Sequence, residues 1–211
     1  MDYDFYIFDC DGVILDSNSI KSNAFAKALE GDPQALILEL ISYHLKNGGI
    51  SRYEKFDYYY NVINPSKNPK KDIKNALKRF GDYVFVELLK CNLIPGILDY
   101  LEELKKKGSF CFVNSGSDEA ELNKIFKDRG IDHFFRKIKG SPSSKNANNQ
   151  AILKDLDVNM RGVFFGDSNL DYKTAKEFNL DFIFISGVSE WKNPSGNFVE
   201  QSEDFNKLLK K

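Results

Sequence analysis

Near its start the chain carries an apolar run that passes directly into two carboxylates, in the stretch Phe5-Tyr6-Ile7-Phe8-Asp9-Cys10-Asp11-Gly12-Val13. The run has the length of a strand and lacks the 3.6-residue spacing of an amphipathic helix, as is typical of a parallel strand buried on both faces. We therefore expect Asp9 and Asp11 at the carboxyl end of a buried strand, which is where open α/β sheets bind their ligands.

Three more runs of this kind occur later in the chain, at residues 110–113, 163–165 and 182–185. Segments with helical spacing lie around them, at residues 96–107, 118–129, 146–156 and 170–178. Strands that alternate with helices predict a doubly wound, Rossmann-like α/β fold with a parallel sheet. The tail is ambiguous, since Trp191 and Pro194 indicate a loop and residues 203–211 a closing helix.

The stretch from residue 16 to residue 94 breaks this alternation. It has no convincing strand, and its apolar residues recur at helical spacing between the turn signals Gly31-Asp32-Pro33, Gly48-Gly49 and Asn64-Pro65. We predict a small α-helical cap domain at residues 16–94, inserted into an α/β core that is formed by residues 1–15 and 95–211.

Composition and charge argue against several classes of function. The 211 residues include 30 basic and 31 acidic side chains, and a net charge of -1 gives no electrostatic reason to expect nucleic acid. No stretch approaches the length of about 20 apolar residues that spans a membrane, and the acidic start Met1-Asp2-Tyr3-Asp4 lacks the basic residues of a signal peptide. We expect a cytoplasmic protein with three free thiols; the sequence indicates no oligomeric state.

Polar residues follow two of the other apolar runs at the point where each run ends. The second run leads into Asn114-Ser115-Gly116-Ser117, and the third into Gly166-Asp167-Ser168-Asn169-Leu170-Asp171. Because the carboxyl ends of parallel strands share one edge of a sheet, four carboxylates should converge there, those of Asp9, Asp11, Asp167 and Asp171.

Such a cluster needs a cation, because two unit charges about 4 Å apart repel by roughly 4 kcal/mol at an effective dielectric constant of about 20. Ligands that are all oxygen favour Mg²⁺ over Zn²⁺, and the ion would let an anionic nucleophile approach a phosphate. Lys145, at the end of the polar segment 140–145, is the candidate for a second positive charge.

At these residues the sequence resembles the haloacid dehalogenase-like hydrolase superfamily, in the helical-capped branch that includes β-phosphoglucomutase and phosphoglycolate phosphatase. The first motif of that family is similar to Phe8-Asp9-Cys10-Asp11-Gly12-Val13 with Asp16-Ser17, and the fourth to Gly166-Asp167-Ser168 with Asp171. Ser115 matches the second motif and Lys145 the third, so the resemblance covers the whole chain, including an inserted helical cap.

The resemblance implies a mechanism. Asp9 is expected to form an aspartyl-phosphate, with Asp11 as the general acid and base. Ser115 and Lys145 are expected to hold the phosphoryl oxygens, with Gly116 as a substrate contact beside them. To act as an acid near neutral pH, Asp11 needs a pKa well above the usual value of about 3.9.

The same resemblance implies a magnesium site. Mg²⁺ would be held by the carboxylates of Asp9 and Asp167 and by the main-chain carbonyl of Asp11. Asp171 would bind the ion through water or would orient Lys145.

Three residues depart from the family pattern. Asn114 is polar where the family usually has an apolar residue, so the second motif could be displaced by one position. Asn146 follows Lys145 where proline is common, which leaves Lys139 as an alternative to Lys145. Asn18 stands where glutamate is often found, at the entry to the cap.

Substrate choice should depend on the cap, which is expected to close over the site. Gly49-Ile50-Ser51-Arg52 is similar to a cap segment of sugar-phosphate enzymes in which the arginine meets the substrate. The guanidinium of Arg52 could hold a phosphate or a carboxylate in a bidentate manner, or could simply lie in solvent at a helix start. Both histidines, His44 and His133, look incidental.

We therefore expect a magnesium-dependent phosphatase that hydrolyses a small phosphorylated metabolite of the sugar phosphate or phosphoglycolate type. A phosphosugar mutase on the same scaffold is an alternative, as is a catalytically silent binding protein that has kept the fold. A dehalogenase is disfavoured, because that branch of the family usually lacks an equivalent of Asp11.

Overall fold

A parallel sheet lies at the centre of the protein, whose computed structural model describes residues 3–209. Within that range the sheet has six strands in the order β3-β2-β1-β4-β5-β6, all parallel. The strands are β1 (Phe5–Phe8), β2 (Phe110–Asp118), β3 (Lys137–Ser141), β4 (Gly162–Gly166), β5 (Asp181–Ile185) and β6 (Glu200–Ser202). The prediction of a doubly wound, Rossmann-like fold is confirmed.

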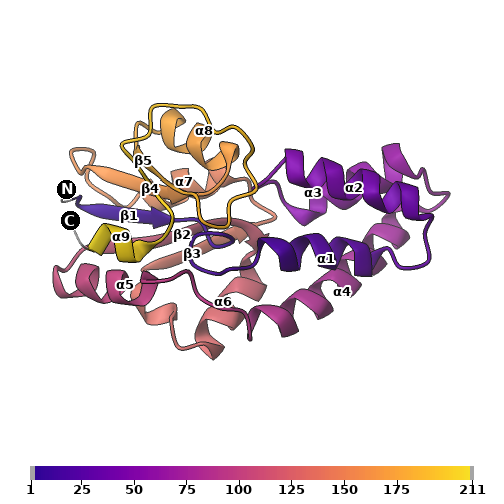
Figure 1. Cartoon of the computed structure of the whole chain (residues 1–211), viewed down its shortest axis with the longest axis horizontal. Coiled ribbons are helices and arrows are strands. Elements are labelled where there is room, and N and C mark those ends of the chain that lie inside the picture. Colours follow the sequence, from indigo (N-terminus) through magenta and orange to yellow (C-terminus); the bar gives the residue numbers. More distant parts are fainter. Residues whose placement is uncertain (1–2, 210–211) are drawn as a thin grey trace.

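Helices cover both faces of the sheet (Figure 1). On one face lie α5 (Ile97–Lys106), α6 (Glu119–Asp128) and α9 (Phe205–Leu209), and on the other α7 (Lys145–Leu153) and α8 (Asn169–Glu177). Successive side chains of a strand point to opposite faces, so Tyr6 and Phe8 enter the first apolar cluster, whereas Phe5 and Ile7 enter the second. Burial on both faces explains why β1 is apolar throughout.

A group of helices lies beyond the carboxyl end of β1, to one side of the sheet (Figure 1). It consists of α1 (Asn18–Ala28), α2 (Gln34–Lys46), α3 (Arg52–Tyr58), a π-helical turn (Tyr59–Ile63) and α4 (Pro69–Leu88). Buried rings of Phe25, Phe56 and Phe80 pack together between these helices, with centroids 4.6 to 5.8 Å apart. The domain boundaries at residues 16 and 94 stay a prediction.

Two strands and several bounds differ from the sequence prediction. The missed strands β3 and β6 are the two edges of the sheet, and their polar sequences Lys-Ile-Lys-Gly-Ser and Glu-Gln-Ser reflect that partly exposed position. β2 continues past the predicted end at residue 113 to Asp118, with a register shift against β3. The closing helix begins at Phe205 rather than at residue 203, and its predicted last residues, Lys210 and Lys211, lie outside the described chain, as do Met1 and Asp2.

No helix among residues 3–209 is long and apolar enough to cross a membrane. A short 3₁₀ turn, Asp132–Phe134, links α6 to β3. The cysteines Cys10, Cys91 and Cys111 are free thiols, as predicted.

Candidate active site

The loop after β1 places the first two carboxylates at the edge of the sheet. Asp9 follows the strand directly and its N–H donates to the carbonyl of Phe165 on β4, at 2.9 Å. Gly12 has a φ of 76°, and a Cβ there would lie 2.2 Å from Oδ2 of Asp167. Only glycine therefore lets the loop turn this closely against the loop after β4.

The loop after β4 and the first turn of α8 supply two more carboxylates, those of Asp167 and Asp171. Ser168 is the N-cap of α8 and forms a capping box with Asp171, whose Oδ2 accepts the Ser168 hydroxyl at 2.6 Å and N–H at 3.1 Å. One carboxylate oxygen each from Asp9, Asp167 and Asp171 lie within 4.8 Å of one another, and all three residues are buried. The capping box at the start of α8 thus holds Asp171 beside Asp9 and Asp167.

Lys145 supplies the positive charge of this cluster. Its Nζ lies 3.0 Å from Oδ1 of Asp9 and forms a second ion pair with Oδ1 of Asp171. Lys139, the alternative, pairs instead with Glu119 at 3.2 Å. The geometry therefore favours Lys145.

Asn114, the polar residue that departs from the family pattern, has a clear structural role. Its buried Nδ2 donates to the carbonyl of Lys145 at 2.9 Å and to Oδ1 of Asn149 at 2.8 Å. The side chain thereby ties the end of β2 to the first turn of α7. Since Lys145 is the first residue of that helix, Asn114 fixes the position from which its ammonium reaches Asp9.

The cluster carries more negative charge than its single ammonium compensates. Burial raises the pKa of Asp9 above its usual value, an effect that Lys145 reduces and that Asp171 and Asp11 increase. Burial likewise raises the pKa of Asp167, and the charges of Asp9 and Asp171 raise it further. For Lys145, burial alone would lower the pKa, but Asp171 and Asp9 outweigh it and raise the pKa. A cation would relieve this excess of charge.

Asp11 lies in a different environment. Its Oδ1 accepts the hydroxyl of Ser17 at 2.5 Å, its Oδ2 accepts that of Ser117 at 2.7 Å, and Lys21 Nζ lies 3.5 Å away. Burial would raise the pKa of Asp11, but Lys21, Ser17 and Ser117 outweigh burial and lower it. The expectation of a raised pKa is therefore wrong for this structure, because three donors stabilise the carboxylate.

Residues 115–117 of β2 lie beside the carboxylates of the site. Ser115 is buried, and its Oγ accepts the N–H of Ser117 at 3.1 Å. Gly116 and Ser117 line the pocket, and a Cβ at Gly116 would lie 2.3 Å from the carbonyl oxygen of Gly49. In this segment it is Ser117 whose hydroxyl contacts Asp11; the role that sequence analysis gave to Ser115, holding a phosphoryl oxygen, stays a prediction.

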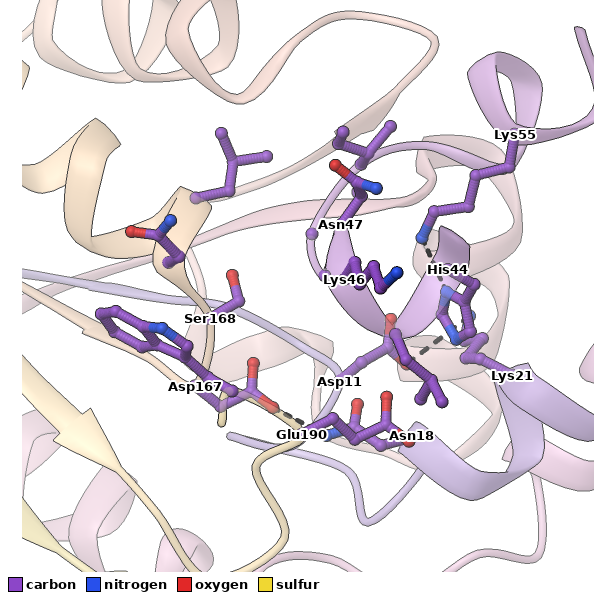
Figure 2. A pocket seen from close by; sticks show the side chains of 18 of the residues that line it. Asp11, Asn18, Lys21, His44, Lys46, Asn47, Lys55, Asp167, Ser168 and Glu190 are labelled. Atoms are coloured by element: carbon purple, nitrogen blue, oxygen red, sulfur yellow. Dashed lines mark hydrogen bonds and ion pairs between the residues drawn. The ribbon is translucent and has the colours of Figure 1, made fainter. Parts of the chain in front are cut away.

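A cavity of about 200 Å³ is bordered by Asp9, Asp11, Asp167, Gly116 and Ser117, whereas Ser115, Lys145 and Asp171 lie behind its lining (Figure 2). The ends of β1, β2 and β4 form one side, which we call the sheet wall. The helices α1, α2 and α3, with the loop that joins α2 to α3, form the other side, which we call the helical wall. The cavity is smaller than the roughly 300–1,000 Å³ of pockets that bind drug-sized ligands, so it suits a small substrate.

Several residues of the pocket carried no functional prediction, namely Lys21, His44, Lys55, Ser117 and Glu190. Lys21 donates to Ser117 Oγ at 2.6 Å. Helical spacing gave one usable signal, since Ser17 and Lys21 are four residues apart and both reach Asp11. Asn18, whose departure from the family pattern seemed to concern only the cap entry, donates to Oδ2 of Asp167 at 2.7 Å (Figure 2).

Arg52 lines the pocket and begins α3, but its charge is already compensated. Its Nη1 lies 2.9 Å from Oε2 of Glu121 and its Nη2 lies 3.8 Å from Oδ2 of Asp118. Tyr53 donates its hydroxyl to the same Asp118 oxygen at 2.6 Å. Arg52 is buried rather than in solvent, and it connects the helical wall to the start of α6. Its contact with substrate stays a prediction.

Comparison with known families gives a match over most of the chain. The profile of a family described as haloacid dehalogenase-like hydrolase matches residues 6–185. None of the curated proteins matches the sequence.

Solved structures share the fold at low sequence identity. CbbY from Rhodobacter sphaeroides, in complex with phosphate, is 18% identical with a TM-score of 0.79, over 98% of this chain and 96% of its own. A predicted phosphoglycolate phosphatase from Haemophilus somnus is 20% identical with a TM-score of 0.76, over 99% and 97%. The HAD-hydrolase YfnB from Bacillus subtilis, bound to magnesium, is 15% identical with a TM-score of 0.72, over 100% and 98%.

Proposed function

The chain belongs to the haloacid dehalogenase-like hydrolases, and from that premise we propose that it is a Mg²⁺-dependent phosphatase. It would hydrolyse a small phosphorylated metabolite through an aspartyl-phosphate on Asp9. The observation that carries this proposal is the convergence of three buried carboxylates, those of Asp9, Asp167 and Asp171, around the ammonium of Lys145.

The donor set at the sheet wall fits Mg²⁺. Its groups are oxygens only, which a hard cation prefers. Burial, together with the neighbouring carboxylates, raises the pKa values of Asp9 and Asp167, and a cation would stabilise their ionised forms. Asp9, Asp167 and the main-chain carbonyl of Asp11 would hold the ion. Asp171 already orients Lys145 by an ion pair, which supports that second role. When bound, the ion would neutralise charge on the nucleophile and the phosphate.

Asp9 would attack phosphorus in line with the leaving oxygen. The P–O bond to the leaving group breaks as the bond from the Asp9 oxygen forms, and water then cleaves the acyl phosphate. Lys145 would hold a phosphoryl oxygen from the far side. Ser115 and Gly116 stay candidates for the same role, and the N–H groups of the loop after Asp9 could assist.

Asp11 would move the protons of both steps. Its lowered pKa favours the carboxylate, which is the form that takes a proton from water in the second step. For the first step it must be protonated, and the arrival of an anionic phosphate would raise its pKa by charge repulsion. The presence of Asp11 also supports phosphoryl transfer over dehalogenation.

Release of phosphate from para-nitrophenyl phosphate in the presence of Mg²⁺ tests this function. We expect Asp9→Asn to reduce kcat by about 10³-fold or more, because the amide is a poor nucleophile. Acid quench of the wild type should trap a phosphoenzyme that hydroxylamine releases. Equal rates for the wild type and Asp9→Asn, with no trapped phosphoenzyme in either, would refute the assignment of the nucleophile.

A further inference from the structure

Two nitrogen-bearing side chains of the helical wall face one another deep in the pocket. Lys55 of α3 and His44 of α2 are both more than nine-tenths buried, and Lys55 Nζ lies 2.7 Å from Nδ1 of His44. Figure 2 shows the amine and the ring pointing toward one another, on the side of the pocket opposite Asp167. Sequence analysis gave neither residue a role.

This pair leaves hydrogen-bond donors without acceptors. When Lys55 is an ammonium it has only donors, so Nδ1 of His44 must then accept, and the neutral ring carries its proton on Nε2. That Nε2 is buried and has no hydrogen-bond partner among residues 3–209. Lys55 has two further N–H donors, and none of the ion pairs within the described chain includes it. A buried donor without an acceptor is unfavourable, so the pair is suited to an acceptor brought by a ligand.

The electrostatics favour a negatively charged acceptor. Burial lowers the pKa of Lys55 to about 7, and burial together with the charge of Lys55 lowers the pKa of His44 to about 3. The charged groups that act on Lys55 come from several elements, namely Asp11, Glu190, Lys21 and Glu54. An anion placed against Lys55 would raise its pKa and restore the full ammonium charge near neutral pH.

The cation predicted from sequence to recognise the substrate is already neutralised. The guanidinium of Arg52 is paired with Glu121 and Asp118, as described above. Lys55 lies three residues further along α3 and also borders the pocket, and no carboxylate among residues 3–209 forms such an ion pair with it. Of these two residues of α3, Lys55 rather than Arg52 is therefore the one whose charge is uncompensated; Lys46 of α2 also borders the pocket but is exposed.

We propose that Lys55 and His44 form a subsite that binds an anionic group, a carboxylate or a second phosphate, on the leaving part of the substrate. The inference rests on the proposed phosphatase function, because it places the phosphate that is cleaved at Asp9. A cavity of about 200 Å³ limits such a substrate to a few carbon atoms between its two anionic groups.

Matched pairs of substrates test the subsite. Phosphoglycolate and ethyl phosphate differ in a carboxylate, and propane-1,3-diol bisphosphate and propyl phosphate differ in a second phosphate. We expect the wild type to prefer one anionic member over its neutral partner in kcat/KM, and the pair that shows the preference identifies the anion. Lys55→Met should reduce that preference at least tenfold. His44→Phe, which removes the Nε2 donor, should also reduce it.

Lys71→Met is the control, since it removes one exposed lysine from α4 and changes the net charge equally. It should keep the wild-type preference. An unchanged preference in Lys55→Met, with thermal unfolding like that of the wild type, would overturn the subsite. So would a wild type that hydrolyses para-nitrophenyl phosphate but prefers neither anionic substrate.

Binding separates failure of the subsite from failure of the phosphatase. In Asp9→Asn with Mg²⁺, calorimetry in two buffers of different ionisation enthalpy should show that phosphoglycolate or the bisphosphate binds more tightly than its neutral partner. At pH 8 this binding should take up a proton that Asp9→Asn/Lys55→Met does not take up. Proton uptake equal in both variants would refute the subsite, whereas an inactive wild type with intact proton uptake would refute only the phosphatase.

Discussion

The two walls of the pocket have opposite imbalances of charge. The sheet wall carries Asp9 and Asp167, and behind it Asp171 lies with them around one ammonium, that of Lys145. The helical wall holds a lysine, Lys55, beside a neutral histidine and with no ion-pair partner within the described chain.

This difference in charge indicates which kind of group each wall is suited to bind. An excess of negative charge suits a wall that receives a cation and the group to be transferred, whereas unsatisfied donors suit a wall that receives an anion. The chemistry would then depend on the ends of the strands, and the choice of substrate on the helices. Four experiments test whether the walls are separable in this way.

The largest effect is expected for Lys145→Met, which removes the ammonium that pairs with Asp9 and Asp171. Loss of a donor to the phosphoryl oxygens should reduce kcat by roughly 10²-fold. Breaking a buried ion pair should also destabilise the protein by about 3–5 kcal/mol. Phosphate release and denaturant unfolding with and without Mg²⁺ measure both, and we expect the ion to restore part of the stability. Wild-type kcat in this variant would remove Lys145 from the mechanism.

A smaller loss is expected for Asn114→Ala, which acts on the sheet wall only through Lys145. Without the bonds to the Lys145 carbonyl and to Asn149, the start of α7 is less well fixed, and kcat should fall roughly tenfold. The split between kcat and KM is the readout, because a purely structural defect would lower the amount of folded enzyme rather than kcat. Asn123→Ala, at an exposed side chain of α6, is the matched control.

Arg52→Ala tests the helical wall and should change rates only several-fold. Since Arg52 connects α3 to Glu121, we expect similar losses of kcat/KM for para-nitrophenyl phosphate and for phosphoglycolate. A rise in KM confined to phosphoglycolate would instead assign Arg52 to substrate recognition, as the sequence predicts.

The smallest effect concerns stability in the absence of metal. The folded pKa values of Asp9 and Asp167 lie above the usual 3.8, so above about pH 4 these two carboxyl groups bind more protons in the folded state than in the unfolded state. Their contribution to stability should therefore fall as the pH rises from about 4 towards neutral, whereas the lowered pKa of His44 acts in the opposite direction over part of this range. Thermal unfolding in EDTA isolates the contribution of Asp167 as the difference between the wild type and Asp167→Asn, whose relative stability should rise with pH, whereas Asp128→Asn, an exposed acid of α6, should follow the wild type. Mg²⁺ should raise the melting temperature at pH 7.

The sequence predicted strands best where burial of both faces makes every residue of the strand apolar. β1, β4 and β5 are apolar because both of their faces are covered, and each was predicted to within a residue or two. The residues that follow strands were equally accessible to prediction, because the topology of a parallel sheet brings strand ends together. The edge strands β3 and β6 were missed because their partly exposed faces carry polar side chains.

The helical wall could not be predicted in the same way. Which side chains of α2 and α3 face the pocket depends on how the helices pack, so nothing local in the sequence distinguishes Lys55 from the other lysines of the chain. The lowered pKa of Asp11 could not be predicted either, because Ser117, one of its donors, is 106 residues away in sequence. Arg52 was noticed for its motif, but its partner Glu121 is 69 residues away.

The contact between Gly49 and Gly116 has a consequence for the catalytic cycle. The Gly49 carbonyl oxygen occupies the space that a side chain at position 116 would need, since a Cβ at Gly116 would be 2.3 Å from it. A methyl group at position 116 would therefore wedge the two walls apart. The trapped phosphoenzyme would then be more open to bulk solvent and to added alcohols, so a Gly116→Ala enzyme should divert part of its phosphate to methanol or glycerol, which product analysis would detect.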